Sequence, residues 1–296
     1  MRSITIFLIL LVFGLSACKN QSEKPQNDFD YRELNSNTKE IKEVLYSMYL
    51  PTDMADIFAR SGANYDPEIP APIDNTTLYT DPEQIAVMLG VYGVDVTYMR
   101  FLEQALPAAQ YLKTLELLSS RINLPDEIFV ETSKHMNDLM SNKDSLSSVI
   151  ENIYRKADEY YKKNGEENLG ALSLLGGWIE AMYIGVSIFE SDSGNNVLAE
   201  RILQQKFSLN SIYTLISNHQ ESFTTRSYVL LLNKLRKAYE KVDIRYQKEG
   251  FSLDTATKKI QAYNTQIRYD DHTMKELLKT IPQIRTEIIT PRLNQK

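Results

Sequence analysis

Residues 85–102 read IAVMLGVYGVDVTYMRFL, and residues 169–189 read LGALSLLGGWIEAMYIGVSIF. Both stretches are apolar on almost every side when they are projected as helices. A helix of this kind is either surrounded by other helices in a core or crosses a membrane. Glu180 lies in the middle of the second stretch, where a bilayer would penalise its charge by a few kcal/mol. We therefore predict two central core helices, with a membrane span at 169–189 as the alternative.

Small residues recur at helical spacing in each stretch. They are Ala86, Gly90, Gly93 and Thr97 in the first stretch and Ser173, Gly177, Ala181 and Gly185 in the second. Small residues let two backbones approach closely, and a glycine inside a helix costs about 1 kcal/mol unless packing compensates. We expect the two sets to face each other. Arg100 and Glu180 flank them, which predicts a buried ion pair across the contact, or alternatively part of a binding site.

Asp95 falls on the opposite face of the first stretch. Its neighbours there are Met88, Val91, Tyr98, Met99 and Leu102. Burial of a carboxylate raises its pKa unless hydrogen bonds compensate, and general acids are tuned in this way. The simpler interpretation, which we prefer, is a structural Asp95 satisfied by a tyrosine hydroxyl or a basic side chain.

Helical periodicity continues through the rest of the chain. It is clearest at Ile41, Val44, Leu45, Met48 and Tyr49, and residues 80–83, TDPE, form a capping box with proline in the first turn. Helices are predicted at 41–49, 80–104, 108–121, 125–141, 146–161, 168–190, 196–205, 208–219, 223–247, 253–266 and 272–288. Alternating period-two runs are lacking. We predict an all-α protein with one multi-helix, bundle-like domain at residues 31–296.

One long connection, from Ser61 to Tyr79, contains Gly62, Pro67, Pro70 and Pro72. A stretch of this length without regular structure is uncommon inside a compact domain. We expect a proline-stiffened strap that lies over the helices, with a functional loop as the alternative.

The N-terminus has the organisation of an export signal. Arg2 precedes an apolar run at residues 4–15, which is shorter than the roughly 20 residues of a membrane-spanning helix. The run ends in Leu15, Ser16, Ala17 and Cys18, which resembles the lipobox of bacterial lipoproteins at all four positions. An ordinary secretory signal or an uncleaved anchor helix is the alternative.

The resemblance to lipoproteins implies cleavage between Ala17 and Cys18 and attachment of lipid to Cys18. Residues 1–17 would then be the signal peptide, and the polar residues 18–30 a flexible, lipidated tether. Two or three acyl chains make such an anchor stable, whereas one does not. By resemblance to the enterobacterial sorting rule, an aspartate at the position of Lys19 would favour retention in the inner membrane, so we expect the outer membrane. No run of acidic residues follows Cys18, as in some surface-exposed lipoproteins, so we expect its periplasmic face.

The body carries a second resemblance. The segments LGVYGVDVTYMRFLEQ, residues 89–104, and LGGWIEAMYIGV, residues 175–186, together with this lipobox resemble uncharacterised helical lipoproteins of Bacteroidetes-type bacteria. This resemblance implies an all-helical body and brings no known activity with it.

Composition and motifs exclude several classes of function. The net charge is −6 without a basic stripe, so nucleic acid is not an expected partner. Cys18 is the only cysteine, which excludes internal disulfides, and its predicted lipidation excludes a cysteine nucleophile. Glu131, His135 and Asp138 share one helical edge, but that edge is the solvated flank of its helix, and we expect no metal there. Common hydrolase, nucleotide and dinucleotide motifs are absent, and no cofactor is expected.

These observations favour a lipid-anchored, non-catalytic protein that binds a partner protein or another envelope component. One alternative is a carrier of small molecules or lipids with a cavity lined by tyrosine and methionine. Its candidate tyrosines are Tyr92, Tyr98, Tyr111, Tyr154, Tyr160, Tyr161 and Tyr183, which core packing explains equally well. The other alternative is an enzyme that uses Asp95 or Glu180.

Overall fold

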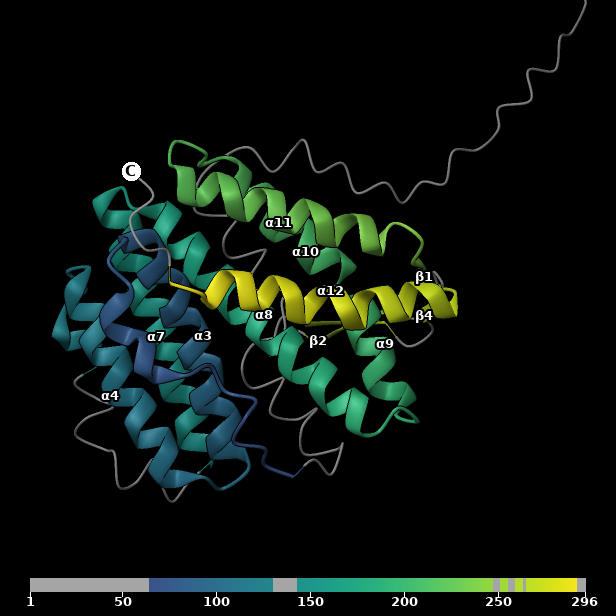
Figure 1. Ribbon diagram of the computed structural model, residues 1–296, viewed down its shortest axis with the longest axis horizontal. Helices are drawn as coiled ribbons and strands as arrows, with labels where there is room; N and C mark the ends of the chain where they lie inside the picture. Colours follow the sequence, from purple (N-terminus) through teal and green to yellow (C-terminus); the bar gives the residue numbers. More distant parts are fainter. Residues whose placement is uncertain (1–63, 130–142, 247–250, 255–258, 263–264, 292–296) are drawn as a thin grey trace, which may run out of the picture. The chain divides into compact units, whose positions relative to one another are not determined.

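Figure 1 shows the computed structural model, which describes residues 64–129, 143–246, 251–254, 259–262 and 265–291. The contacts divide the chain into Met1–Leu34 and Asn35–Lys296, and all described residues belong to the second unit. These residues are mostly helical, which confirms the all-α prediction. The helices are α3 (Pro82–Phe101), α4 (Ala105–Arg121), α7 (Lys143–Asn164), α8 (Glu167–Ser191), α9 (Asn196–Gln204), α10 (Lys206–Ser217), α11 (Phe223–Tyr239) and α12 (Asp271–Ile289).

Two short 3-10 helices, η2 (Ile73–Leu78) and η3 (Asp126–Ile128), complete the helical elements of the described chain. Only η3 is described within the helix predicted at 125–141. The signal peptide, the tether and the helix predicted at 41–49 lie outside the described residues.

Helices α3 and α8 form the most extensive contact between elements, as the small residues predicted. A Cβ atom on Gly90 would lie 1.9 Å from the carbonyl oxygen of Ser173, and one on Gly176 would lie 1.9 Å from that of Val87. Two backbones therefore touch directly where these glycines lie. The match is partial, because Gly93 faces Tyr154 of α7 and Gly185 lies nearest Leu198 of α9. Gly176, which makes one of the two closest contacts, is not in the predicted set.

Helix α8 is surrounded by α3, α7, α9, α10 and α12 (Figure 1). By length and composition it is the one helix of the described chain that could cross a membrane. However, 78% of its apolar 18-residue stretch is buried inside the protein. A helix covered by protein on so many sides has the environment of a core helix. This burial accounts for its nearly uniform apolar character.

The N-termini of α3 and α11 are joined through two carboxylates. Asp81, the N-cap of α3, accepts a hydrogen bond from the amide of Glu83 (3.0 Å) and another from the hydroxyl of Thr224 (2.5 Å). Glu83 in turn accepts from the amide of Thr225 (3.2 Å) and the hydroxyl of Ser222. The predicted capping box is therefore wrong in detail, since Asp81 and not Thr80 is the N-cap and Glu83 helps to cap a different helix.

Two of the predicted helices are wrong near the C-terminus. The helix predicted at 223–247 ends at Tyr239, and the one predicted at 253–266 is replaced by short strands. Strand β1 (Asp243–Tyr246) pairs antiparallel with β4 (Thr265–Arg268), and β2 (Phe251–Asp254) pairs antiparallel with β3 (Lys259–Ala262). The second pair is nested within the first along the chain. Strands of four residues are too short for a period of two to stand out in the sequence.

Candidate functional site

The segment 64–79, here called the strap, crosses the helices as the prolines predicted. Its main-chain polar groups bond to side chains of α3 and α4, because an irregular segment has no ladder of its own to satisfy them. The contacts are Asp66 amide to Tyr98 hydroxyl (3.0 Å), Ala71 amide to Asp95 Oδ2 (3.0 Å), Tyr111 hydroxyl to Ala71 carbonyl (2.7 Å) and Tyr92 hydroxyl to Pro72 carbonyl (3.0 Å). Three of the candidate tyrosines therefore hold the strap.

The end of the strap is fastened in the same way. Arg121 of α4 donates to the carbonyls of Thr76 (2.9 Å) and Tyr79. The hydroxyl of Tyr79 donates to the carbonyl of Ile289 at the end of α12 (2.8 Å). The strap thus links α3, α4 and α12, helices that are distant in the sequence.

A cluster of charged side chains lies beneath the strap. Asp95 and Glu180 have no exposed surface, and Arg285 is 6% exposed. Arg285 donates from Nε to Glu180 Oε2 (2.9 Å) and from Nη2 to Glu180 Oε1 (2.7 Å), and Nη2 also donates to the carbonyl of Ile69 in the strap (3.1 Å). This two-bond geometry is the strongest form of an arginine–carboxylate pair.

Asp95 completes the cluster from the other side. Its Oδ2 accepts from the amide of Ala71, while Oδ1 is buried with no hydrogen-bond partner among the described residues. Glu180 is close enough to act on the Asp95 carboxyl group electrostatically. Burial raises the pKa of Asp95 well above 3.8, and the nearby Glu180 carboxylate raises it further, against the opposing effect of Arg285. Both effects favour the protonated, neutral form of Asp95. The cluster then consists of a neutral Asp95, a Glu180 anion and an Arg285 cation.

The guanidinium of Arg285 remains charged in this environment. Burial, the largest single effect, would lower its pKa, but the contacts with Glu180, together with Asp95 and Tyr183, raise the pKa above its usual value. The guanidinium carbon also lies 4.3 Å from the centre of the Tyr183 ring, a cation–π contact. One positive and one negative charge therefore balance inside the core.

The partner predicted for Glu180 is wrong, since Arg285 of α12 occupies both carboxylate oxygens and Arg100 does not bind them. The reason lies in the direction of the helices. Asn168 near the start of α8 donates to Glu83 near the start of α3 (3.5 Å), and Asp95 and Glu180 interact farther along the same two helices, so α3 and α8 run in the same direction. Arg100 is five residues beyond Asp95, about 7.5 Å farther along the helix axis at about 1.5 Å per residue.

The sequence predicts Asp95 on the face of α3 that points away from α8. It also predicts that a tyrosine hydroxyl or a basic side chain is the hydrogen-bond partner of Asp95. The structure instead brings it together with Glu180 and a main-chain amide of the strap. Helix α3 is buried on nearly all sides, so the face opposite α8 is not a separate environment.

Replacing Asp95→Asn should make stability less dependent on pH. The folded protein, with its raised Asp95 pKa, keeps a proton that the unfolded chain loses above pH 3.8. The stability contributed by this proton is complete below that pH and declines as the pH rises toward the native pKa. An asparagine amide keeps a donor toward Glu180 at every pH. In urea unfolding, the free energy of unfolding of the variant, relative to that of the wild type, should therefore rise from pH 4 to 7. The rise should be up to about 1.4 kcal/mol per pH unit. A difference that does not change with pH would contradict a protonated Asp95.

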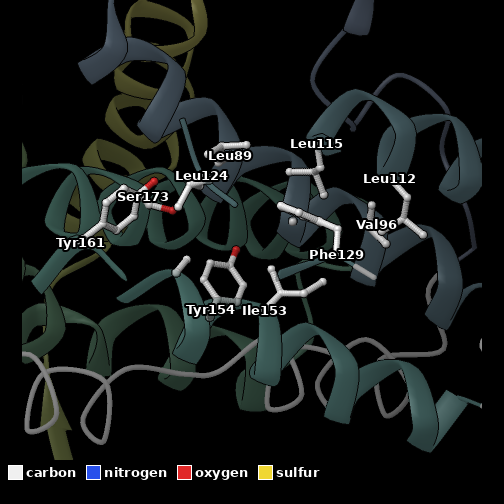
Figure 2. Close-up of a pocket in the computed structure, with 12 residues that line it drawn as sticks. Leu89, Val96, Leu112, Leu115, Leu124, Phe129, Ile153, Tyr154, Tyr161 and Ser173 are labelled. Atoms are coloured by element: carbon white, nitrogen blue, oxygen red, sulfur yellow. The ribbon is translucent and has the colours of Figure 1, made fainter. Parts of the chain in front are cut away.

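A small cavity lies between α3, α4, α7 and α8 (Figure 2), and Asp95, Glu180 and Arg285 are not among its lining residues. It is partly open, and its volume is about 40 Å³. The lining residues are Leu89, Gly93, Val96, Leu112, Leu115, Leu124, Phe129, Ile153, Tyr154, Ala157, Tyr161 and Ser173. Tyr154 and Tyr161 are two of the candidate tyrosines, and no methionine lines this cavity.

The other candidate residues do not form a site in the described part of the chain. Ala17, Cys18, Glu131, His135 and Asp138 lie outside the described residues. In the part of the chain that the structure describes, no group of three histidine, cysteine, aspartate or glutamate side chains could hold a metal ion.

Comparison with known proteins adds no assignment. No protein-family model matches the sequence, and no curated protein or solved structure matches it significantly.

Proposed function

We propose that this chain is a lipid-anchored protein of the bacterial outer membrane, on the periplasmic face, whose helical body is a non-catalytic binding module. The observation that carries the proposal is the sequence Leu15-Ser16-Ala17-Cys18 after a short apolar run. Cys18 is also the only cysteine in 296 residues, so its occurrence at this position supports a dedicated role.

The non-catalytic character of the body is supported by how its buried carboxylates are used. General acid or base catalysis requires a group within hydrogen-bonding reach of a substrate. Both carboxylate oxygens of Glu180 accept from Arg285, and Asp95 Oδ2 accepts from the Ala71 amide of the strap. Neither carboxylate lines the cavity. Their contacts join α3, α8, α12 and the strap, which favours a structural role.

Cys18→Ser should prevent anchoring, because serine offers no thiol for the thioether to diacylglycerol. The expected result is an unprocessed precursor and loss of the mature, lipid-modified form from the outer-membrane fraction. Cell fractionation with immunoblotting measures both, and labelling with a radioactive or alkyne fatty acid should fall to background.

The matched control replaces residues 1–18 by a signal for ordinary secretion. Its product should appear folded in the soluble periplasmic fraction, because the described body keeps α8 covered by protein. If this product or the Cys18→Ser protein is fully labelled by fatty acid, the anchor is not on Cys18. If the unlipidated body still partitions with membranes, α8 or another segment provides the attachment.

A further inference from the structure

Helix α11 has an exposed face in the described part of the chain. The helix packs against α10, α12 and α3 through its buried side. Five outward positions are exposed, namely Phe223, Arg226, Leu230, Lys234 and Lys237. At about 100° per residue, these positions fall within an arc of about 80°. They form one stripe, here called the α11 stripe, which is about 21 Å long at about 1.5 Å per residue.

Two large apolar side chains belong to the α11 stripe. Phe223 is 58% exposed and Leu230 is 69% exposed. Single exposed apolar residues are ordinary on a protein surface. Among the described helices, α4 also has two large apolar side chains of this kind, Leu106 and Leu117. Apolar exposure alone therefore does not identify a partner, and the charge of the surface has to distinguish the two helices.

The charge of α11 differs from that of the chain as a whole. Its 17 residues contain four basic side chains and no acidic one. The whole chain, by contrast, has a net charge of −6. The acidic residues nearest in the sequence, Glu221 and Glu240, lie beyond the two ends of the helix. The α11 stripe is thus a local cationic surface on an acidic protein.

A surface of this composition is complementary to a membrane that contains anionic lipid. Basic side chains on an amphipathic helix attract the phosphate groups of such lipids. Apolar side chains among them enter the boundary between the headgroups and the acyl chains. A helix that binds in this way lies in the plane of the membrane, and the α11 stripe extends along most of its helix.

We infer that the α11 stripe docks the helical body on a membrane surface that contains anionic phospholipid. Phe223 and Leu230 enter the headgroup boundary, and the three basic residues of the stripe pair with lipid phosphates. The inference rests on the proposed anchor, because lipid on Cys18 keeps the body at the membrane. Each basic residue near an anionic surface strengthens binding about fivefold. Three of them orient an anchored body, but they do not hold a released body on the membrane against dilution.

Phe223→Trp reports docking, because brominated lipid quenches an indole only when the indole enters the bilayer. The naturally processed variant is added to preformed vesicles of phosphatidylcholine, with or without phosphatidylglycerol, and both kinds contain brominated phosphatidylcholine. Trp178, the only native tryptophan, is 3% exposed, and the wild type provides its emission as the background. After this subtraction, emission should be at least twofold lower in anionic than in neutral vesicles. About 0.5 M salt should abolish the difference, since the Debye length is then roughly 4 Å.

Removing two cations tests the role of charge directly. Lys234→Gln and Lys237→Gln, added together to Phe223→Trp, should weaken docking about 25-fold. The quenching in anionic vesicles should then fall to the level in neutral vesicles. Arg226 is left in place, because it also donates to two main-chain carbonyls that precede the helix.

The matched control is Leu117→Trp on α4. Leu117 is 52% exposed and Leu106 of the same helix is 74% exposed, but α4 also contains Glu116. The indole at this position should not be quenched in either kind of vesicle.

Four outcomes would each overturn the inference. They are equal quenching at the two positions, equal quenching of Phe223→Trp in neutral and anionic vesicles, no quenching of that variant in anionic vesicles, and full quenching after the lysine substitutions. Flotation of the wild type with neutral vesicles tests the anchor separately, because it requires acyl chains and no charge. A protein that does not float with neutral vesicles contradicts the anchor, and the quenching in anionic vesicles still tests the α11 stripe.

Discussion

Gly176→Ala is expected to lower the free energy of unfolding by about 3 kcal/mol or more. The new Cβ would lie 1.9 Å from the carbonyl oxygen of Val87 and 2.8 Å from its carbonyl carbon. Both are main-chain atoms of α3, so no side chain can rotate away to make room. The two helices would have to separate along the most extensive contact in the described structure. Urea or thermal unfolding of the purified variant measures the loss.

Gly185→Ala is the matched control in the same helix. Its Cβ would meet only the Leu198 side chain, at 3.9 Å, which is ordinary van der Waals contact. Alanine is favoured over glycine inside a helix by up to about 1 kcal/mol, so this change should be neutral or stabilising. If Gly176→Ala were tolerated as well as Gly185→Ala, the backbone contact between α3 and α8 described here would be incorrect.

Arg285→Met should lower the unfolding free energy by about 3–5 kcal/mol. The substitution keeps much of the side-chain length but removes the cation, and Glu180 is then an unpaired anion with no exposed surface. The carbonyl of Ile69 in the strap also loses its donor. The unfolding free energy of Arg285→Lys should lie between those of the wild type and Arg285→Met, because an ammonium group keeps the charge without the two-bond geometry.

The control is Arg155→Met, which removes an exposed arginine. Arg155 pairs with Glu159 at 2.8 Å, but these side chains are 57% and 63% exposed. Exposed pairs one helical turn apart contribute only about 0.3–0.5 kcal/mol. A loss at Arg285 no larger than the loss at Arg155 would show that the buried cluster does not stabilise the fold. Chemical denaturation of the four proteins provides the comparison.

The central pair of helices was predictable from the sequence because its signal is local. Residues 85–102 and 169–189 are too apolar for a surface helix, and the glycines at helical spacing indicate a close contact. The spacing did not identify which glycine of the second stretch lies against the backbone of Val87. Gly176 and Gly177 are adjacent, and the crossing geometry that places Gly176 on Val87 is not encoded in spacing alone.

The charged cluster depends on packing between distant segments, which explains why its composition was missed. Arg285 is 105 residues from Glu180 in the sequence and belongs to an amphipathic helix that has several other basic residues. A helical projection places Asp95 on a face but does not say what covers that face. The strap covers it, and its Ala71 amide takes the role assigned to a tyrosine or a basic side chain.

The tyrosines show the same limit. Their positions on apolar faces were readable, but the sequence does not show that Tyr92, Tyr98 and Tyr111 bond to the strap while Tyr161 is left unpartnered at a cavity. Prolines in the strap predicted an irregular segment and gave no indication of its partners. The short strands from Asp243 to Arg268 were missed because each has only four residues.

Lipid attachment at Cys18 is the central claim, and mass spectrometry of the N-terminal peptide tests it most directly. The protein is extracted from the outer-membrane fraction, treated with a thiol-alkylating reagent and digested. We predict a peptide that begins at Cys18, carries diacylglycerol on sulfur and an acyl group on the α-amine, and is not alkylated. A peptide with residues before Cys18, or with an alkylated Cys18 thiol, would contradict the claim.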